Sequence, residues 1–155
     1  MHKPSSPIQF HFPTPCSLPH RRLLKAFIRS LFKKEKQKLG GLTLIFCDDK
    51  YLLQLNRQFL QHDFYTDILS FPLSEPGEPL TAEIYISVER VRDNAKNLKT
   101  RITDELLRVI FHGVLHFCGY KDKTPREILK MRAMEDGCLR AYQRKRARFQ
   151  ARRGQ

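Results

Sequence analysis

The chain has 155 residues, 41% of them hydrophobic, which is enough for a single domain with a substantial core. Lys and Arg number 29 against 16 Asp and Glu, and this basic balance favours nucleic acid or another acidic surface as the partner. The absence of an 18-residue apolar run, of an apolar signal core and of any Cys-x-x-Cys pair predicts a cytoplasmic protein with reduced thiols and no membrane partner.

The first forty residues combine a proline-rich segment with a basic helix. Ile8–Phe12 alternates as a short edge strand would, and apolar residues on one face predict a helix over about His20–Lys38. The opposite face of this helix is cationic. Two interpretations of it remain open, an ordinary solvated surface and an RNA-binding patch made of Arg21, Arg22, Lys25 and Arg29.

A buried strand and a helix follow the break at Gly40–Gly41. The apolar run Leu42–Cys47 is typical of a strand buried in a sheet. Asp48 is a good N-cap for a helix over about residues 49–60, and this helix carries Arg57.

Two further strands are predicted at residues 67–72 and 82–87. In the second strand, alternation places Glu83 on the face turned away from the core. On that face Glu83 is either a general base, a residue that supports a metal ligand, or an ordinary solvated residue. Ser87 can then cap a polar helix over about residues 88–98.

The C-terminal third is predicted to contain two helices. The first begins near Thr103–Asp104, a good cap, and the second follows the capping box at residues 124–127 and runs to about Arg148. From Gly137 onward there are seven Arg or Lys and no acid, so we expect a basic tail from about residue 145 that frays into an arm.

The segment from His112 to Asp122 has the spacing of a metal site. His112 and His116 are four residues apart, so a helix would place both imidazoles on one face about 6 Å apart along the axis. Gly119 can end the helix in the left-handed conformation, and Asp122 offers an oxygen ligand after the turn. Three such ligands leave an open fourth position on a metal ion.

The same helix carries a polar stripe on an otherwise apolar surface. Glu105, Arg108, His112 and His116 fall on that stripe, and buried polar groups require partners. The histidines are therefore either metal ligands or hydrogen-bonded core residues. Glu105 either orients one imidazole through its second nitrogen or only stabilises the first helical turn.

Three blocks of this sequence resemble a known family. HGVLHFCGYKD at His112–Asp122 is similar to the signature of the YbeY family of ribosomal RNA maturation endoribonucleases. NRQFLQHDFYTDILSFP at Asn56–Pro72 resembles a second block of that family, and AEIYIS at Ala82–Ser87 resembles a third, with Glu83 in place of Asp.

The order of predicted elements indicates an α+β fold with one small mixed sheet and helices packed around it. The resemblance implies the same fold, as one YbeY-like metallohydrolase domain over residues 1–155. It also implies a four-stranded sheet with about five helices and a central, zincin-like metal helix.

The resemblance further implies a metal-dependent, single-strand-specific endoribonuclease that acts in ribosomal RNA maturation and ribosome quality control, with the small ribosomal subunit as partner. By this resemblance His112, His116 and Asp122 hold one Zn²⁺, and Arg57 stabilises the phosphate. The family has a histidine where this chain has Asp122, so manganese or another divalent ion remains an alternative to zinc.

Two other functions remain open. A metal-dependent peptidase would need a carboxylate base, and Gly113 stands where His-Glu-x-x-His proteases have glutamate, which leaves only Glu83 or Glu105. A non-catalytic RNA- or ribosome-binding factor would use the metal only to hold the fold. In that case Arg57 would make only a surface salt bridge, with Asp63 or Asp67.

Overall fold

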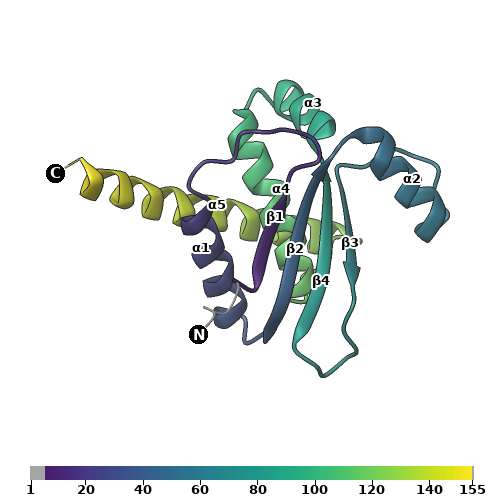
Figure 1. The fold of residues 1–155 in the computed structure, drawn as a ribbon, viewed down its shortest axis with the longest axis horizontal. Coiled ribbons are helices and arrows are strands. Elements are labelled where there is room, and N and C mark those ends of the chain that lie inside the picture. Colours follow the sequence, from purple (N-terminus) through teal and green to yellow (C-terminus); the bar gives the residue numbers. More distant parts are fainter. Residues whose placement is uncertain (1–5, 155) are drawn as a thin grey trace.

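The computed structural model describes residues 6–154, which form a four-stranded sheet and five helices (Figure 1). The strands are β1 (Ile8–His11), β2 (Leu39–Cys47), β3 (Ile68–Pro72) and β4 (Leu80–Ser87), in the spatial order β1-β2-β4-β3. β1, β2 and β4 are parallel, whereas β3 runs antiparallel to β4. The predicted α+β fold with a mixed sheet is confirmed, and β1 is an edge strand as expected.

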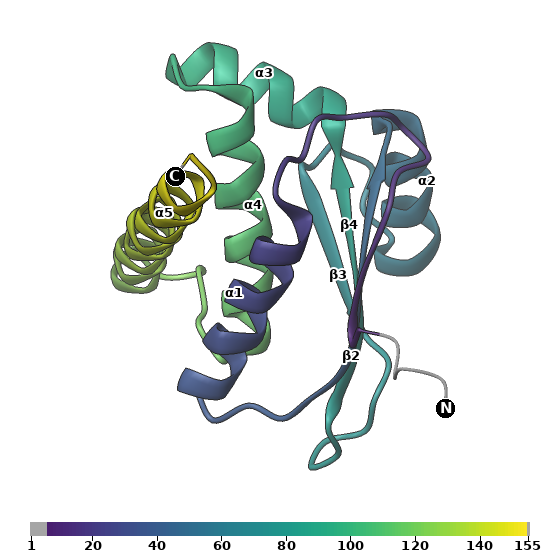
Figure 2. The ribbon, with the colours of Figure 1, turned by 60° about the vertical axis from the view of Figure 1, so that its left-hand side comes forward.

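The helices cover both faces of the sheet unequally. They are α1 (Arg21–Lys34), α2 (Asp49–Leu60), α3 (Val88–Leu98), α4 (Ile102–Phe117) and α5 (Pro125–Arg153). Figure 2 shows α1 and α4 against one face, α5 outside α4, and α2 against the opposite face. None of the described helices is both long and apolar enough to cross a membrane.

The main core lies between the sheet and α4. Alternate residues of β2 and β4, such as Leu44 and Ile84, point towards this helix and are fully buried with Ile110 and Val114. Because α5 covers the other side of α4, most of the α4 circumference is apolar. The helix that carries the histidines is therefore a rigid central element.

Gly113 lets α4 approach the sheet closely. A Cβ atom at this position would lie 2.8 Å from Cδ1 of Ile68 and 3.0 Å from Cδ1 of Ile84. Gly113 thus faces the sheet, and because it has no side chain, α4 can pack close to Ile68 and Ile84.

The predicted helix N-caps in the middle and last parts of the chain are confirmed at three positions. Asp48 accepts a hydrogen bond from the Tyr51 amide, Ser87 from the Arg90 amide and Thr124 from the Glu127 amide.

Four predicted boundaries were wrong. The expected break at Gly40–Gly41 is absent from the described structure, because β2 begins at Leu39 and continues through both glycines. The N-cap of α4 is Arg101, two to three residues earlier than expected, and neither Thr103 nor Asp104 caps the helix. α1 ends at Lys34 because β2 already begins at Leu39. The expected frayed arm is helical, since α5 continues to Arg153 with Phe149 packed against His20.

We predict that Gly113→Ala fails to stabilise the protein although alanine favours helix. The gain of about 1 kcal/mol in helix propensity is opposed by overpacking that costs about 1–3 kcal/mol. Denaturant unfolding should show a loss, which Ile68→Val in the same chain should reduce because it removes the nearest methyl group.

Gly137→Ala is the matched control, because a Cβ atom at this α5 position would meet nothing within 4 Å. We expect it to stabilise the protein by about 0.5–1 kcal/mol. Equal stabilisation by both alanine substitutions would show that Gly113 is not required for packing.

Candidate metal centre

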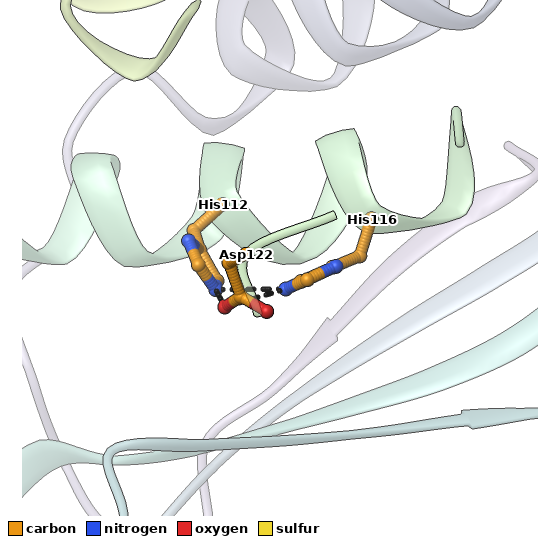
Figure 3. Close-up of side chains that lie close together, drawn as sticks. All are labelled: His112, His116 and Asp122. Carbon is orange, nitrogen blue, oxygen red and sulfur yellow. Dashed lines mark hydrogen bonds and ion pairs between the residues drawn. The ribbon is translucent and has the colours of Figure 1, made fainter. Parts of the chain in front are cut away.

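Three side chains meet at the C-terminal end of α4 (Figure 3). His112 and His116 project from the same face of the helix, and their Nε2 atoms are 3.0 Å apart. The chain turns at Gly119, whose φ of 99° is the left-handed conformation expected there, and returns Asp122 to the histidines. Oδ2 of Asp122 lies 3.3 Å from Nε2 of His112 and 3.2 Å from Nε2 of His116.

The second nitrogen of each imidazole fixes the tautomer. Nδ1 of His116 lies 2.9 Å from the carbonyl oxygen of Tyr120, which can only accept a hydrogen bond, so Nδ1 carries the proton. Nδ1 of His112 lies 2.8 Å from Oε2 of Glu135, a carboxylate that likewise accepts. With the proton on Nδ1, the neutral form of each imidazole turns the lone pair of Nε2 towards Asp122.

The donor set fits a divalent metal ion. When both imidazoles are neutral, two Nε2 lone pairs and a carboxylate oxygen converge, an arrangement that a cation satisfies. Tetrahedral zinc with bonds near 2.0–2.1 Å places its ligands about 3.3 Å apart, close to the separations found here. The three predicted ligands could hold a metal ion.

Glu135 of α5 positions His112. Its side chain is buried, and Oε1 accepts a hydrogen bond of 2.8 Å from Nη1 of Arg108 while Oε2 contacts His112. The carboxylate therefore fixes the orientation of the imidazole and supports its basicity.

Glu105 does not contact an imidazole, which was one of its two predicted roles. Glu105 pairs with Arg108, whose Nε donates to Oε2 over 2.9 Å and whose Nη2 donates to Oε1. Glu105 and His112 are seven residues apart on α4, whereas Glu135 approaches from a neighbouring helix. Glu105 thus acts on Arg108, and Glu135 is the residue that sequence reasoning missed.

Charge around His112 offsets its burial. Although burial favours the neutral imidazole, the hydrogen bond and negative charge of Glu135 hold the pKa of His112 above its usual value. Burial alone would raise the pKa of the Glu135 carboxyl, but its hydrogen bonds and ion pairs with His112 and Arg108 lower this pKa below its usual value. Glu135 is therefore ionised when it contacts the ring.

Arg57 does not contact the three candidate ligands. It lies near the end of α2, and its Nε pairs with Asp63, both side chains being largely exposed. Asn56 is buried beside it and donates from Nδ2 to the carbonyl of Phe64 over 2.9 Å, which holds the loop between α2 and β3. The predicted salt bridge with Asp63 is present.

Asp67 lies further along the same loop, within the electrostatic influence of His112. Burial raises the pKa of this carboxyl, and the charges of His112 and Arg108 only partly offset that effect. Asp67 also accepts a hydrogen bond from Nδ2 of Asn94 over 3.3 Å. The loop thus runs from the partner of Arg57 to the neighbourhood of His112.

Glu83 lies on the other face of the sheet from α4, as its alternation with the buried Ile84 requires. Its carboxylate accepts a hydrogen bond from the hydroxyl of Tyr85, on that same face. The structure does not bring Glu83 to the histidines, because the sheet stands between them.

The predicted RNA patch lies on α1. Arg21, Arg22 and Arg29 are exposed and Lys25 is half-buried. The guanidinium of Arg21 stacks over Phe12 at 4.1 Å, and Lys25 lies 5.3 Å from the ring centre of Phe10. These contacts fix the stems of both side chains against the edge of the sheet.

We predict that Glu135→Gln lowers metal affinity by about 10–100-fold, because the amide is uncharged and can present its NH₂ group to His112. Competition with a chelating dye would measure the loss. Glu105→Gln should have a smaller effect, since it acts only through Arg108. Equal losses in the two variants would contradict a direct role of Glu135.

We also predict that Asp122 is required for metal retention. Elemental analysis of untagged protein purified without chelator should find about one zinc or other transition metal per chain, and little in Asp122→Ala. An undiminished metal content in Asp122→Ala would remove this residue from the ligand set.

The chain is similar to known proteins over most of its length. A family model described as "Endoribonuclease YbeY" matches residues 17–143. Proteins named Endoribonuclease YbeY from Cytophaga hutchinsonii and Flavobacterium psychrophilum are each 47% identical to it, over 126 and 116 residues. These alignments cover 81% and 75% of this chain, and 88% and 82% of the relatives.

A solved structure has the same fold. The solution structure of TM1509 from Thermotoga maritima superposes with a TM-score of 0.56 at 25% identity, covering 89% of this chain and 93% of that protein. With the match over residues 17–143 and the identities above, the chain belongs to the endoribonuclease YbeY family.

Proposed function

We propose that this protein is a metal-dependent, single-strand-specific endoribonuclease that acts in ribosomal RNA maturation and ribosome quality control in the cytoplasm. The observation that carries the proposal is the convergence of three lone-pair donors, His112, His116 and Asp122, in a chain of the endoribonuclease YbeY family. The small ribosomal subunit is the proposed partner, by the resemblance of the sequence motifs.

The proposed chemistry begins with the ligand set. When bound there, zinc or another divalent ion supplies positive charge that polarises a phosphoryl oxygen or lowers the pKa of a water molecule. Glu135 and the Tyr120 carbonyl hold the Nδ1 protons, so that both histidines keep Nε2 free as a ligand. Asp122 contributes negative charge and, as a harder donor than histidine, keeps manganese among the candidate ions.

Arg57 is proposed to bind the phosphate and stabilise its charge as the bond breaks. A guanidinium offers two parallel donors that match phosphate oxygens. Its ion pair with Asp63 is exposed and such pairs contribute only about 0–1 kcal/mol. A phosphate can therefore displace Asp63 at little cost, and the buried Asn56 keeps the adjoining loop in place.

The structure gives little support to a peptidase. The two carboxylates that could serve as its base are engaged elsewhere, Glu83 with Tyr85 on the far face of the sheet and Glu105 with Arg108. Gly113 faces Ile68 and Ile84 in the core, so this position cannot supply a base either.

We predict that Arg57→Ala lowers the rate of RNA cleavage by about 100-fold or more and leaves metal content unchanged. Arg57→Lys is the matched control, because it keeps the charge but loses the bidentate fork, and we expect it to recover only part of the rate. Cleavage would be measured on a labelled single strand and on the same sequence annealed to its complement.

The non-catalytic alternative makes opposite predictions. If the metal only stabilises the fold, Arg57→Ala leaves function intact and His112→Ala unfolds the chain. RNA with single deoxy substitutions would identify the nucleophile, since loss of cleavage at a substituted position indicates attack by the ribose 2′-hydroxyl. Absence of cleavage by metal-loaded wild-type protein on any ribosomal RNA fragment would refute the proposed activity.

A further inference from the structure

The end of α5 extends past the part of the chain that the family model matches. That match stops at residue 143, whereas the helix continues to Arg153. Figure 1 shows these last turns projecting beyond the sheet and the other helices. The last turns of α5 therefore lie outside the matched residues and are helical.

One face of the C-terminal half of α5 is an arginine ladder, which begins just before this extension. We use this name for Arg140, Arg144, Arg148 and Arg152, which recur every fourth residue and are all exposed. No acid occurs after Asp136, and within residues 6–154 none of the four arginines forms an ion pair. Like charges at this spacing destabilise a helix, so the ladder is a surface that an anion would stabilise.

The opposite side of the extension is fixed to α1. Phe149 packs edge-on against His20 with ring centres 5.7 Å apart, and Nε2 of Gln150 lies 3.4 Å from Nε2 of His20. Nζ of Lys145 lies 5.4 Å from the ring centre of Phe27. Phe149 is about 140° around the helix from Arg144 and 100° from Arg148, but only about 60° from Arg152. This anchoring therefore turns the ladder away from α1 most clearly at its start and least at its end.

Cations of α1 meet the last turn of α5 beside the ladder. A hollow between the two helices is lined by Arg21 and Arg22 from one side and by Phe149 and Arg153 from the other. Arg153, next to the last ladder residue, thus links the cations in the first turn of α1 to the end of α5.

The geometry of the arginine ladder suits the backbone of a nucleic acid duplex. Successive arginines are about 6 Å apart along the axis and the four span about 18 Å, a regular array of forks that bind phosphate bidentately. Proteins that hold single strands add exposed aromatic rings for stacking. From Gln143 to Gly154 the one aromatic residue is Phe149, which is turned to His20.

We propose that the arginine ladder, with Arg21 and Arg22, binds the phosphate backbone of an RNA duplex that flanks the single strand presented to the metal centre. This inference rests on the proposed function, from which it takes RNA as the nucleic acid that is bound. It assigns the extension a role in selecting substrates in which a helix adjoins the cleaved strand.

Binding to a blunt RNA duplex of about 16 base pairs tests the proposal without cleavage. We expect the full chain carrying Arg144→Gln, Arg148→Gln and Arg152→Gln to bind about tenfold or more weakly at low salt. The slope of log affinity against log salt should fall by about two to three, the number of phosphate contacts removed.

A matched variant controls for net charge. Arg92→Gln, Lys96→Gln and Lys99→Gln remove three exposed cations from α3 and its end, and duplex affinity should stay near that of the wild type. An unchanged affinity in the α5 variant, or an equal loss in the α3 variant, would overturn the assignment. So would unchanged duplex binding with lost binding to vesicles containing anionic phospholipid, which would assign the ladder to a membrane surface.

Phe149→Ala tests whether the ladder must be rigid, because it keeps every cation and removes the anchor. We expect a several-fold loss of duplex affinity. An unchanged affinity would show that the ladder need not be rigid and binds as a flexible basic tail. Since duplex binding requires no catalysis, a failure to cleave RNA would reject the proposed function and leave this measurement valid.

Discussion

The half-buried guanidinium of Arg108 connects the fold to the candidate site. It lies between Glu105 of its own helix and Glu135 of α5, and its charge permits both carboxylates to be buried. The same bond places Glu135 against His112. Removing Arg108 would leave two acids without their partner, so the packing of α5 on α4 and the orientation of the imidazole depend on one side chain.

Features set by neighbours in sequence could be predicted. The spacing of His112 and His116 forces both rings onto one face of a helix, and the turn at Gly119 returns Asp122 to them. The three N-caps at Asp48, Ser87 and Thr124 are equally local. The mixed sheet was also predictable, because its strands and helices follow one another in an order that few folds accommodate.

Features that depend on contacts between residues distant in the sequence could not be predicted. Glu135 meets His112 across two helices, and only its place between Met131 and Cys138 on the buried stripe of α5 hinted at a role. Composition predicted a frayed end for α5, but His20, more than a hundred residues away, holds Phe149. Alternation placed Glu83 on the outer face correctly, yet could not show that its partner there is Tyr85.

The charges around the histidines have a consequence for electroneutrality. Glu105, Glu135 and Asp122 bring three carboxylates to this region, and Arg108 supplies one compensating cation within their hydrogen-bonded group. With Asp67 also nearby, negative charge is in excess around the histidines, partly in a low-dielectric interior where such an excess is unfavourable. A divalent ion held by the three candidate ligands would offset more of this excess than a monovalent ion. The charge of the site would therefore favour a divalent ion before coordination geometry contributes.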